Sequence, residues 1–199
     1  VSQQMMNELN LHGKPYVVMN STLAGMQAQI VANRLLCKGS PYDFAVIIGV
    51  ELISMFTVFL LSQVGVVSND PVRPFNKESD GTNPGESASC AIFVSEEKLH
   101  KDRKHLNIPY AVKYRGGIVT TDPVSEGNLD PEGNGLQMAI QKVMAQESIR
   151  NLSFITAQGV GLKAFDYLTA KAIDKAGLRR VPVNSFEGNF GHSSGSTSL

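Results

Sequence analysis

A change in the hydrophobic pattern at Ser21 organises the chain. The β-branched run at residues 16–20 predicts a buried strand, and the small and helix-forming residues at 23–37 predict a helix that Gly39 closes in a left-handed conformation. A sharp turn from strand to helix lifts one side chain above the sheet and aims it at the positive end of the helix. Ser21 is therefore a candidate nucleophile, and the alternative is that Asn20, Ser21 or Thr22 simply caps the helix, because these residue types are preferred at N-caps.

The longest apolar stretch covers residues 44–67. It predicts a strand at 43–50 that runs into a helix at 52–63, both buried with their faces covered, as in an α/β sheet. The stretch is long enough to cross a bilayer, but Glu51 and several polar residues interrupt it and no basic cluster flanks it. We therefore expect no membrane span.

The other segments complete an α/β pattern. In the first 120 residues we expect a short helix at 2–10, a polar loop at 68–86, a strand at 88–95, a charged surface helix or turn at 96–105, and a second strand of the same hairpin at 110–120. In the remainder we expect a loop at 121–135, helices at about 134–148 and 164–176, strands at 152–157 and 181–184, and a glycine-flanked turn at 188–195. Strands that alternate with helices in this way are typical of an α/β unit.

Composition narrows the possible classes of function. The chain has 199 residues, 42% hydrophobic and 18% charged, which is enough for one substantial core or two small ones. Lys plus Arg and Asp plus Glu both total 18, so no net charge would attract nucleic acid or an anionic membrane. Cys37 and Cys90 are too few for a disulfide framework or a cysteine-based zinc site, which favours a cytoplasmic location. No motif predicts a metal or a nucleotide cofactor.

Four short motifs stand in a fixed order along the chain. They are STLA at 21–24 with IGV at 48–50, RPFNKESDG at 73–81 with GESA at 85–88, TAQGV at 156–160 followed by Asp166, and NSFEGNFGH at 184–192. In this order they resemble the nucleophile turn, the "RPFD…DG…GEGA" loop, the "AHGT…D" loop and the "STK…GH" segment of the β-ketoacyl synthases of the thiolase superfamily. The resemblance implies an α/β protein with the layered α-β-α-β-α thiolase-like fold, here incomplete. Residues 1–120 would be part of its N-terminal repeat and residues 121–199 part of its C-terminal repeat.

The resemblance also implies four catalytic positions, and three of them are changed. Ser21 stands at the position of the Cys nucleophile, Gln158 at the first His and Glu187 at the Lys, while His192 keeps the second His. A serine hydroxyl is scarcely ionised near neutral pH and needs an adjacent base, and Gln158 cannot take up a proton. Glu187 places an anion where a carboxylate substrate or an oxyanion would sit. We therefore expect decarboxylative condensation to fail.

Smaller departures point in the same direction. Thr169 stands where the family often has an acid, and Ser87 and Ser89 replace glycines of the "GEGAG" strand, so we expect this strand to be packed differently. The resemblance begins about one strand and helix before the nucleophile turn and ends at the GH motif, and family members are considerably longer. The chain is therefore either a piece of a longer protein or a shortened homologue that another chain completes.

The departures favour a non-catalytic β-ketoacyl synthase homologue, similar to the chain-length factor of type II polyketide or aryl-polyene systems. Such a subunit would pair with an active ketosynthase in fatty acid or polyketide biosynthesis, shape its acyl tunnel and work with an acyl carrier protein. We expect a heterodimer, with a homodimer as the second possibility, through the apolar segment 44–67 and the helix at 23–37. The candidate wall residues, which could equally be core, are Met55, Phe56, Phe59, Leu60 and Phe75.

Two enzymatic functions remain as alternatives. Ser21 could be the nucleophile, and His192 its base, of an acyltransferase or thioesterase of the thiolase superfamily that acts without decarboxylation. The family's own acyltransferase activity, condensation, is the less favoured alternative because three of the four positions are changed. In neither case does the sequence predict a cofactor.

Overall fold

The computed structural model describes residues 2–102, 104–105, 110–122 and 129–199. The first half contains helix α1 (Ser2–Glu8), a 3-10 turn η1 (Ser21–Leu23), helix α2 (Ala24–Leu35), strand β1 (Phe44–Glu51), helix α3 (Met55–Gln63), strand β2 (Ser87–Val94) and helix α4 (Glu96–Asp102). The second half contains helix α5 (Asn134–Gln146), strand β3 (Ile155–Thr156), helix α6 (Lys163–Lys175), strand β4 (Val183–Asn184), helix α7 (Glu187–Phe190) and a 3-10 turn η2 (Ser194–Ser196). The chain is thus a mixed α/β protein, as the sequence predicts.

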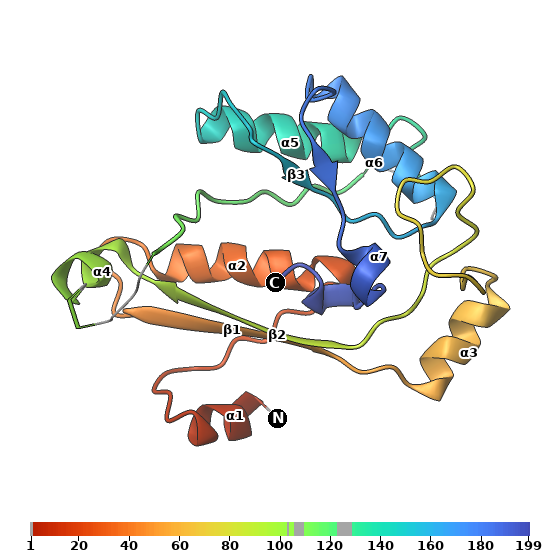
Figure 1. The fold of residues 1–199 in the computed structure, drawn as a ribbon. Helices are drawn as coiled ribbons and strands as arrows, with labels where there is room; N and C mark the ends of the chain where they lie inside the picture. Colours follow the sequence, from red (N-terminus) through yellow and green to blue (C-terminus); the bar gives the residue numbers. More distant parts are fainter. Residues whose placement is uncertain (1, 103, 106–109, 123–128) are drawn as a thin grey trace.

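Strands β1 and β2 form an antiparallel ribbon whose register runs from Phe44 opposite Val94 to Glu51 opposite Ser87. Figure 1 shows α2 lying along this ribbon, with α5 and α6 beyond it. The predicted pairing of the strand at 88–95 with residues 110–120 is wrong, because β1 takes that position. Residues 110–120 form no strand and pass along α2 instead, where a side chain at Gly117 would come within 2.8 Å of Ile30.

The predicted strand at 16–20 is also wrong. These residues are assigned no strand, and Val17 and Met19 are 70% and 88% exposed. A β-branched run becomes a strand only when a neighbouring strand pairs with its backbone groups. No described segment pairs with this one, so its composition alone does not make it a strand.

Helix α3 contradicts the expectation that residues 44–63 are buried on both faces. Ser54 caps α3 by accepting a hydrogen bond from Thr57 N, but the helix has no buried residue, and Met55 is 86% exposed. Figure 1 shows α3 at the far end of the ribbon, away from α2. Its apolar composition therefore forms a surface, because no described element packs over it. No helix of the described residues is long and apolar enough to cross a membrane.

The second half forms the expected α/β unit. Strands β3 and β4 are parallel, with Ile155 opposite Val183, and α5 packs beside α6. The core of this unit consists of Ala157, Ile173 and Leu178, with partly buried apolar side chains of α5 around them. Residues 123–128 of the predicted loop at 121–135, and 106–109 of the segment before it, lie outside the described residues.

The polar loop at 68–86 joins the two halves. Residue pairs Val67–Thr82 and Pro84–His192 form isolated parallel bridges. His192 N donates a hydrogen bond to Asn83 O at 2.7 Å, and Gly85 N donates one to His192 O at 2.9 Å. The loop therefore holds the end of the chain, including the GH motif, against the start of β2.

Candidate functional site

Ser21 occupies a strained turn at the start of a helical segment. Its φ is +43°, in the left-handed region that favours glycine, and it begins η1, which continues directly into α2. Asn20, in the N-cap position, makes no capping hydrogen bond with its side chain, which donates to Gln27 Oε1 instead. A strained serine that no cap explains is typical of a functional position. The strained backbone at Ser21 agrees with the nucleophile-turn interpretation, although the strand before it is missing.

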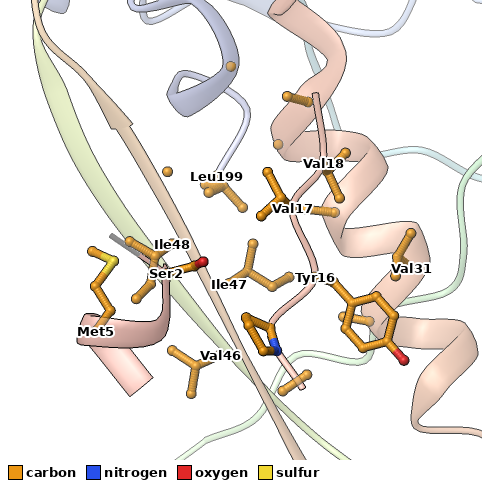
Figure 2. Close-up of a pocket in the computed structure, with 18 of the residues that line it drawn as sticks. Ser2, Met5, Tyr16, Val17, Val18, Val31, Val46, Ile47, Ile48 and Leu199 are labelled. Carbon is orange, nitrogen blue, oxygen red and sulfur yellow. The ribbon is translucent and has the colours of Figure 1, made fainter. Parts of the chain in front are cut away.

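Ser21 lines a cavity of about 820 Å³. Its walls come from α1, the extended residues before Ser21, α2, β1 and the end of the chain, and in Figure 2 Val17 and Val18 lie across it from Ile47. The lining is mainly apolar, so the cavity suits a hydrocarbon more than an ion. None of the five wall residues predicted from the sequence lines it. Four of them lie on α3, and Phe75 packs against the core of the second half.

His192 and Glu187 are in contact. His192 Nδ1 lies 3.4 Å from each oxygen of the Glu187 carboxylate, and the geometry is that of a hydrogen bond to Oε1. Glu187 is 1% exposed, whereas His192 is only partly buried. A carboxylate bonded to Nδ1 favours the tautomer with the proton on that nitrogen, which leaves Nε2 free to accept a proton.

Gly159, the residue after Gln158, is linked to Glu187 through Ser185. The Ser185 hydroxyl accepts hydrogen bonds from Gly159 N at 3.2 Å and from Glu187 N at 3.4 Å. Ala157 N also donates to Asn184 O, which continues the pairing of β3 with β4 to the residue before Gln158. The parallel strands therefore bring the TAQGV and GNFGH motifs together, as their places at two strand ends require.

Asp166 attaches a third motif, the RPF turn, to the same region by accepting hydrogen bonds. Its Oδ2 accepts hydrogen bonds from Phe75 N at 2.8 Å and from Gly161 N at 3.2 Å, so the RPF turn is attached to the start of α6. Burial raises the pKa of Asp166, and the nearby charge of Glu187 raises it further, while the backbone donors oppose this shift. Two carboxyl groups therefore share one largely buried region.

Ser21 is connected to this region by η2, the last 3-10 turn of the chain, which packs against η1. A side chain at Gly195 would lie 3.0 Å from Ser21 O, so η2 packs directly against η1. The hydroxyl groups of Ser87 and Ser89 bond to Ser196, which shows how the two serines that replace glycines pack. No hydrogen bond joins Ser21 to Gln158, Glu187 or His192 in the part of the chain that the structure describes. The structure thus brings Glu187 and His192 together, and the gathering of all four residues around Ser21 stays a prediction.

Sequence reasoning missed three residues that build the site. Ser185 and Ser196 provide bridging hydroxyl groups, and Asn83 binds Val72 N through Oδ1 and the carbonyls of Ser68 and Asp70 through Nδ2. Serine and asparagine are common in loops, so only their positions next to the motifs could have indicated these roles.

Comparisons with known proteins agree with this arrangement. Residues 110–199 match the family model of the β-ketoacyl synthase C-terminal domain. The chain is 26% identical over 197 residues to the highly reducing polyketide synthase VdtX of Byssochlamys spectabilis, a match that covers 96% of this chain and 9% of that protein.

Solved ketosynthase structures resemble the chain over nearly its whole length. The ishigamide ketosynthase/chain length factor has a TM-score of 0.85 at 22% identity, covering 98% of this chain and 48% of that one. The ketosynthase ApeO in complex with its chain length factor ApeC from Xenorhabdus doucetiae has a TM-score of 0.85 at 20% identity, covering 99% and 47%. A type II polyketide synthase acyl-carrier protein in complex with its ketosynthase, AntDE:AntF, has a TM-score of 0.85 at 18% identity, covering 98% and 50%. The chain spans half or less of each of these structures. It has the thiolase-like α/β fold of the ketosynthases, and its residues 110–199 are similar to their C-terminal domain.

Proposed function

We propose that the chain is a non-catalytic ketosynthase homologue that pairs with an active ketosynthase and limits the length of the acyl chain that the partner builds. The observation that carries this proposal is the buried carboxylate of Glu187 bonded to His192. A condensing site must hold the carboxylate of a malonyl unit and stabilise the negative charge that forms as CO₂ leaves. An anion at this position repels both charges.

The other changed positions support the same proposal. Within the described part of the chain no base is hydrogen-bonded to the Ser21 hydroxyl, and Gln158 can donate a hydrogen bond but cannot exchange a proton. Loss of the thiolate, of one imidazole and of the cation removes the groups that activate the nucleophile and promote decarboxylation. The backbone of the site is kept, because the RPF, TAQGV and GH segments still meet.

Exposed apolar surface supports a protein partner. Phe44, Ile48 and Val50 on β1 are exposed, and so are Met55 and Phe56 on α3. Contiguous exposed apolar side chains mark interaction surfaces. The predicted contribution of α2 is smaller, because Gly117 and Gly195 approach Ile30 and Ala24 and cover part of this helix. The ribbon edge and α3 are therefore the surfaces that we assign to the partner.

The similar solved structures indicate which class of partner to propose for this chain. Two of them contain a ketosynthase together with a chain length factor, and a third contains an acyl-carrier protein with its ketosynthase. We extend these partners to this chain as part of the proposal, and fatty acid or polyketide biosynthesis as its setting. A homodimer is the outcome that would replace the heterodimer.

Decarboxylation of a malonyl carrier-protein thioester tests the proposal. The chain alone should release no CO₂ above the rate without protein, and it should change the product length of an active ketosynthase with which it co-purifies. The triple variant Ser21→Cys/Gln158→His/Glu187→Lys, which keeps His192, restores the family's four groups and serves as a comparison. Release of CO₂ by the unaltered chain would refute the non-catalytic role.

The Glu187–His192 contact also supports the acyltransferase or thioesterase alternative. A carboxylate that orients the imidazole is the third member of a nucleophile, base and carboxylate arrangement. The alternative does not lead, because no hydrogen bond joins Ser21 to His192 among the described residues. Mass spectrometry after incubation with an acyl carrier-protein thioester separates the two functions: we expect no adduct, and an acyl group on Ser21 would establish the alternative.

A further inference from the structure

Strand β1 has one edge without a partner. Among the described residues it pairs with β2 alone, in a sheet of two strands. In an antiparallel pair the backbone groups of a strand point alternately toward its partner and away from it, so about half of the N–H and C=O groups of β1 lie on the free edge. An open edge of this kind is a template for a further strand.

The cavity beside Ser21 runs along this free edge. All eight residues of β1, Phe44–Glu51, line the cavity. Because successive side chains of a strand point to opposite faces, a cavity that lay against one face would meet only every second residue. Contact with every residue in turn therefore places the cavity at the edge of the strand, where both faces reach it.

The wall opposite β1 is a second segment whose backbone has no partner. Residues 12–20 line the cavity without interruption, and among the described residues no backbone-to-backbone hydrogen bond is formed by residues 12–19. In Figure 2, Val17 and Val18 of this segment lie across the cavity from Ile47 of β1. Two unpaired backbones with strand composition thus face each other across one space.

The size and the lining of the cavity suit an added strand. At the spacings of packed sheets one strand residue occupies roughly 160 Å³, so a cavity of about 820 Å³ holds about five residues of one strand. A hydrocarbon would match the apolar lining but would cover the N–H and C=O groups of the free edge without bonding to them, which is costly. An extended polypeptide with apolar side chains satisfies both the lining and the edge.

The free edge is continuous with the surface assigned to the partner above. Phe44, Ile48 and Val50 are exposed, and all three line the cavity. The chain covers 50% and 48% of two of the similar solved structures, so proteins of this fold contain segments that have no equivalent in these residues.

We propose that the ketosynthase partner supplies a β-strand that enters the cavity, pairs with the free edge of β1 and lies against residues 16–20. Addition of a strand to an open sheet edge is a recurrent mode of recognition, in which backbone hydrogen bonds provide affinity. This inference rests on the function proposed above, because it specifies how the partner of that function binds. It also makes the partner a wall of the cavity that Ser21 lines.

Hydrogen exchange resolved to single amides tests the added strand, in the chain alone and in its complex with the active ketosynthase. In the chain alone we expect slow exchange at every second amide of β1, those that point to β2, and fast exchange at residues 16–20. In the complex the other amides of β1 should slow at least tenfold, because they gain backbone acceptors. The amides of Tyr110 and Val112, which are exposed and lie outside the cavity, are the internal control and should exchange equally in both states.

Proline variants separate strand pairing from simple coverage of the surface. Val17→Pro and Val18→Pro each remove one N–H from a segment that forms no backbone bond in the chain itself, and neighbouring N–H groups of an extended segment point in opposite directions. One of the two variants should therefore weaken the complex at least tenfold, and the other should weaken it less. Val112→Pro is the matched control and should bind normally. If the proline variants do not fold, the exchange comparison still decides.

Three outcomes would overturn the inference, and they differ in what they mean for the function. A complex that forms without slower exchange at the free edge of β1 refutes the added strand and leaves the proposed function standing. Protection of this edge in the chain alone that increases with its concentration would show that a second copy supplies the strand. Failure to form a complex with any ketosynthase would refute the inference together with the proposed function.

Discussion

Phe75 N donates a hydrogen bond to Asp166 Oδ2 at 2.8 Å, across 91 positions of the sequence. Phe75 itself has φ +59°, an unfavourable conformation for a residue with a side chain, and this bond helps to hold it there. The carboxylate thus fixes the RPF turn and, through Gly161 N, the loop after β3. Asp166 is a structural centre of the site even though, among the described residues, no hydrogen bond joins it to Ser21.

Removal of the Asp166 carboxylate should destabilise the protein. Asp166→Ala removes the acceptor of the partly buried Phe75 N and of the buried Gly161 N, and hydrogen bonds to charged groups contribute about 1.5–3 kcal/mol each, so we expect a loss of about 3 kcal/mol. Asp166→Asn keeps one acceptor oxygen and should lose less. Urea unfolding measures both, with the exposed carboxylate variant Asp174→Asn as a control that should stay within about 0.5 kcal/mol of the parent. Equal stability of Asp166→Ala and the parent would contradict this role.

We expect the folding stability of the protein to depend on pH through the carboxylate of Glu132. Hydrogen bonds and ion pairs with Lys171 and Lys175 lower the pKa of Glu132 from 4.5 to about 2. Because the folded state binds this proton more weakly than the unfolded state, the stabilising contribution is present above pH 4.5 and is lost as the pH falls toward 2. Glu132→Gln should therefore reduce the decrease in Tm between pH 5 and about 2.5.

The exposed position of Glu132 limits the size of this effect, because solvent screens surface ion pairs. Glu8→Gln is a suitable control, since Glu8 is an exposed helical carboxylate with no ion pair in the described residues. A pH profile of Glu132→Gln that matches the parent would show that the two lysines do not hold this carboxylate in solution.

The sequence predicts the elements whose signal is local. The Val-Ile-Ile run of β1, the helical periodicity of α5 and α6, and Gly39 with its φ of +81° all appear where expected. The failures concern pairing and burial. Residues 16–20 have strand composition without a strand partner, and α3 has core composition without a covering layer, because both properties depend on segments that local composition does not reveal.

The candidate site likewise has features that the sequence predicts and features that it does not. The motif order predicts that Gln158, Glu187 and His192 gather around Ser21, and the structure brings two of them, Glu187 and His192, into contact. The bond from Glu187 to His192 required side-chain geometry that spacing does not give. Ser185 and Ser196 could not be selected at all, since nothing distinguishes a bridging serine from the other serines in loops.

Close packing of α2 against the end of the chain gives another testable prediction. Gly25 is buried, and a side chain there would lie 2.4 Å from Gly195 O and 2.5 Å from Ser198 Oγ. Gly25→Ala should therefore displace the last turn and cost about 2 kcal/mol, despite the higher helix propensity of alanine. Gln27→Ala, on the same helix, should cost less than 1 kcal/mol. Guanidinium unfolding compares the two variants, and a Gly25→Ala protein that is more stable than the parent would contradict the packing.

The exposed apolar surface gives the last prediction. Val50 on β1 is 53% exposed and Phe56 on α3 is 69% exposed, so a charge at either position should change the stability of the isolated chain by about 0.5 kcal/mol or less. If a ketosynthase partner covers this surface, Val50→Lys and Phe56→Lys bury a charge without a counter-ion in the complex, and each should weaken binding at least tenfold. Glu97→Lys, on the exposed face of α4, is the control and should bind normally. Size-exclusion chromatography with light scattering measures the complex, and retention of the heterodimer by both variants would place the interface elsewhere.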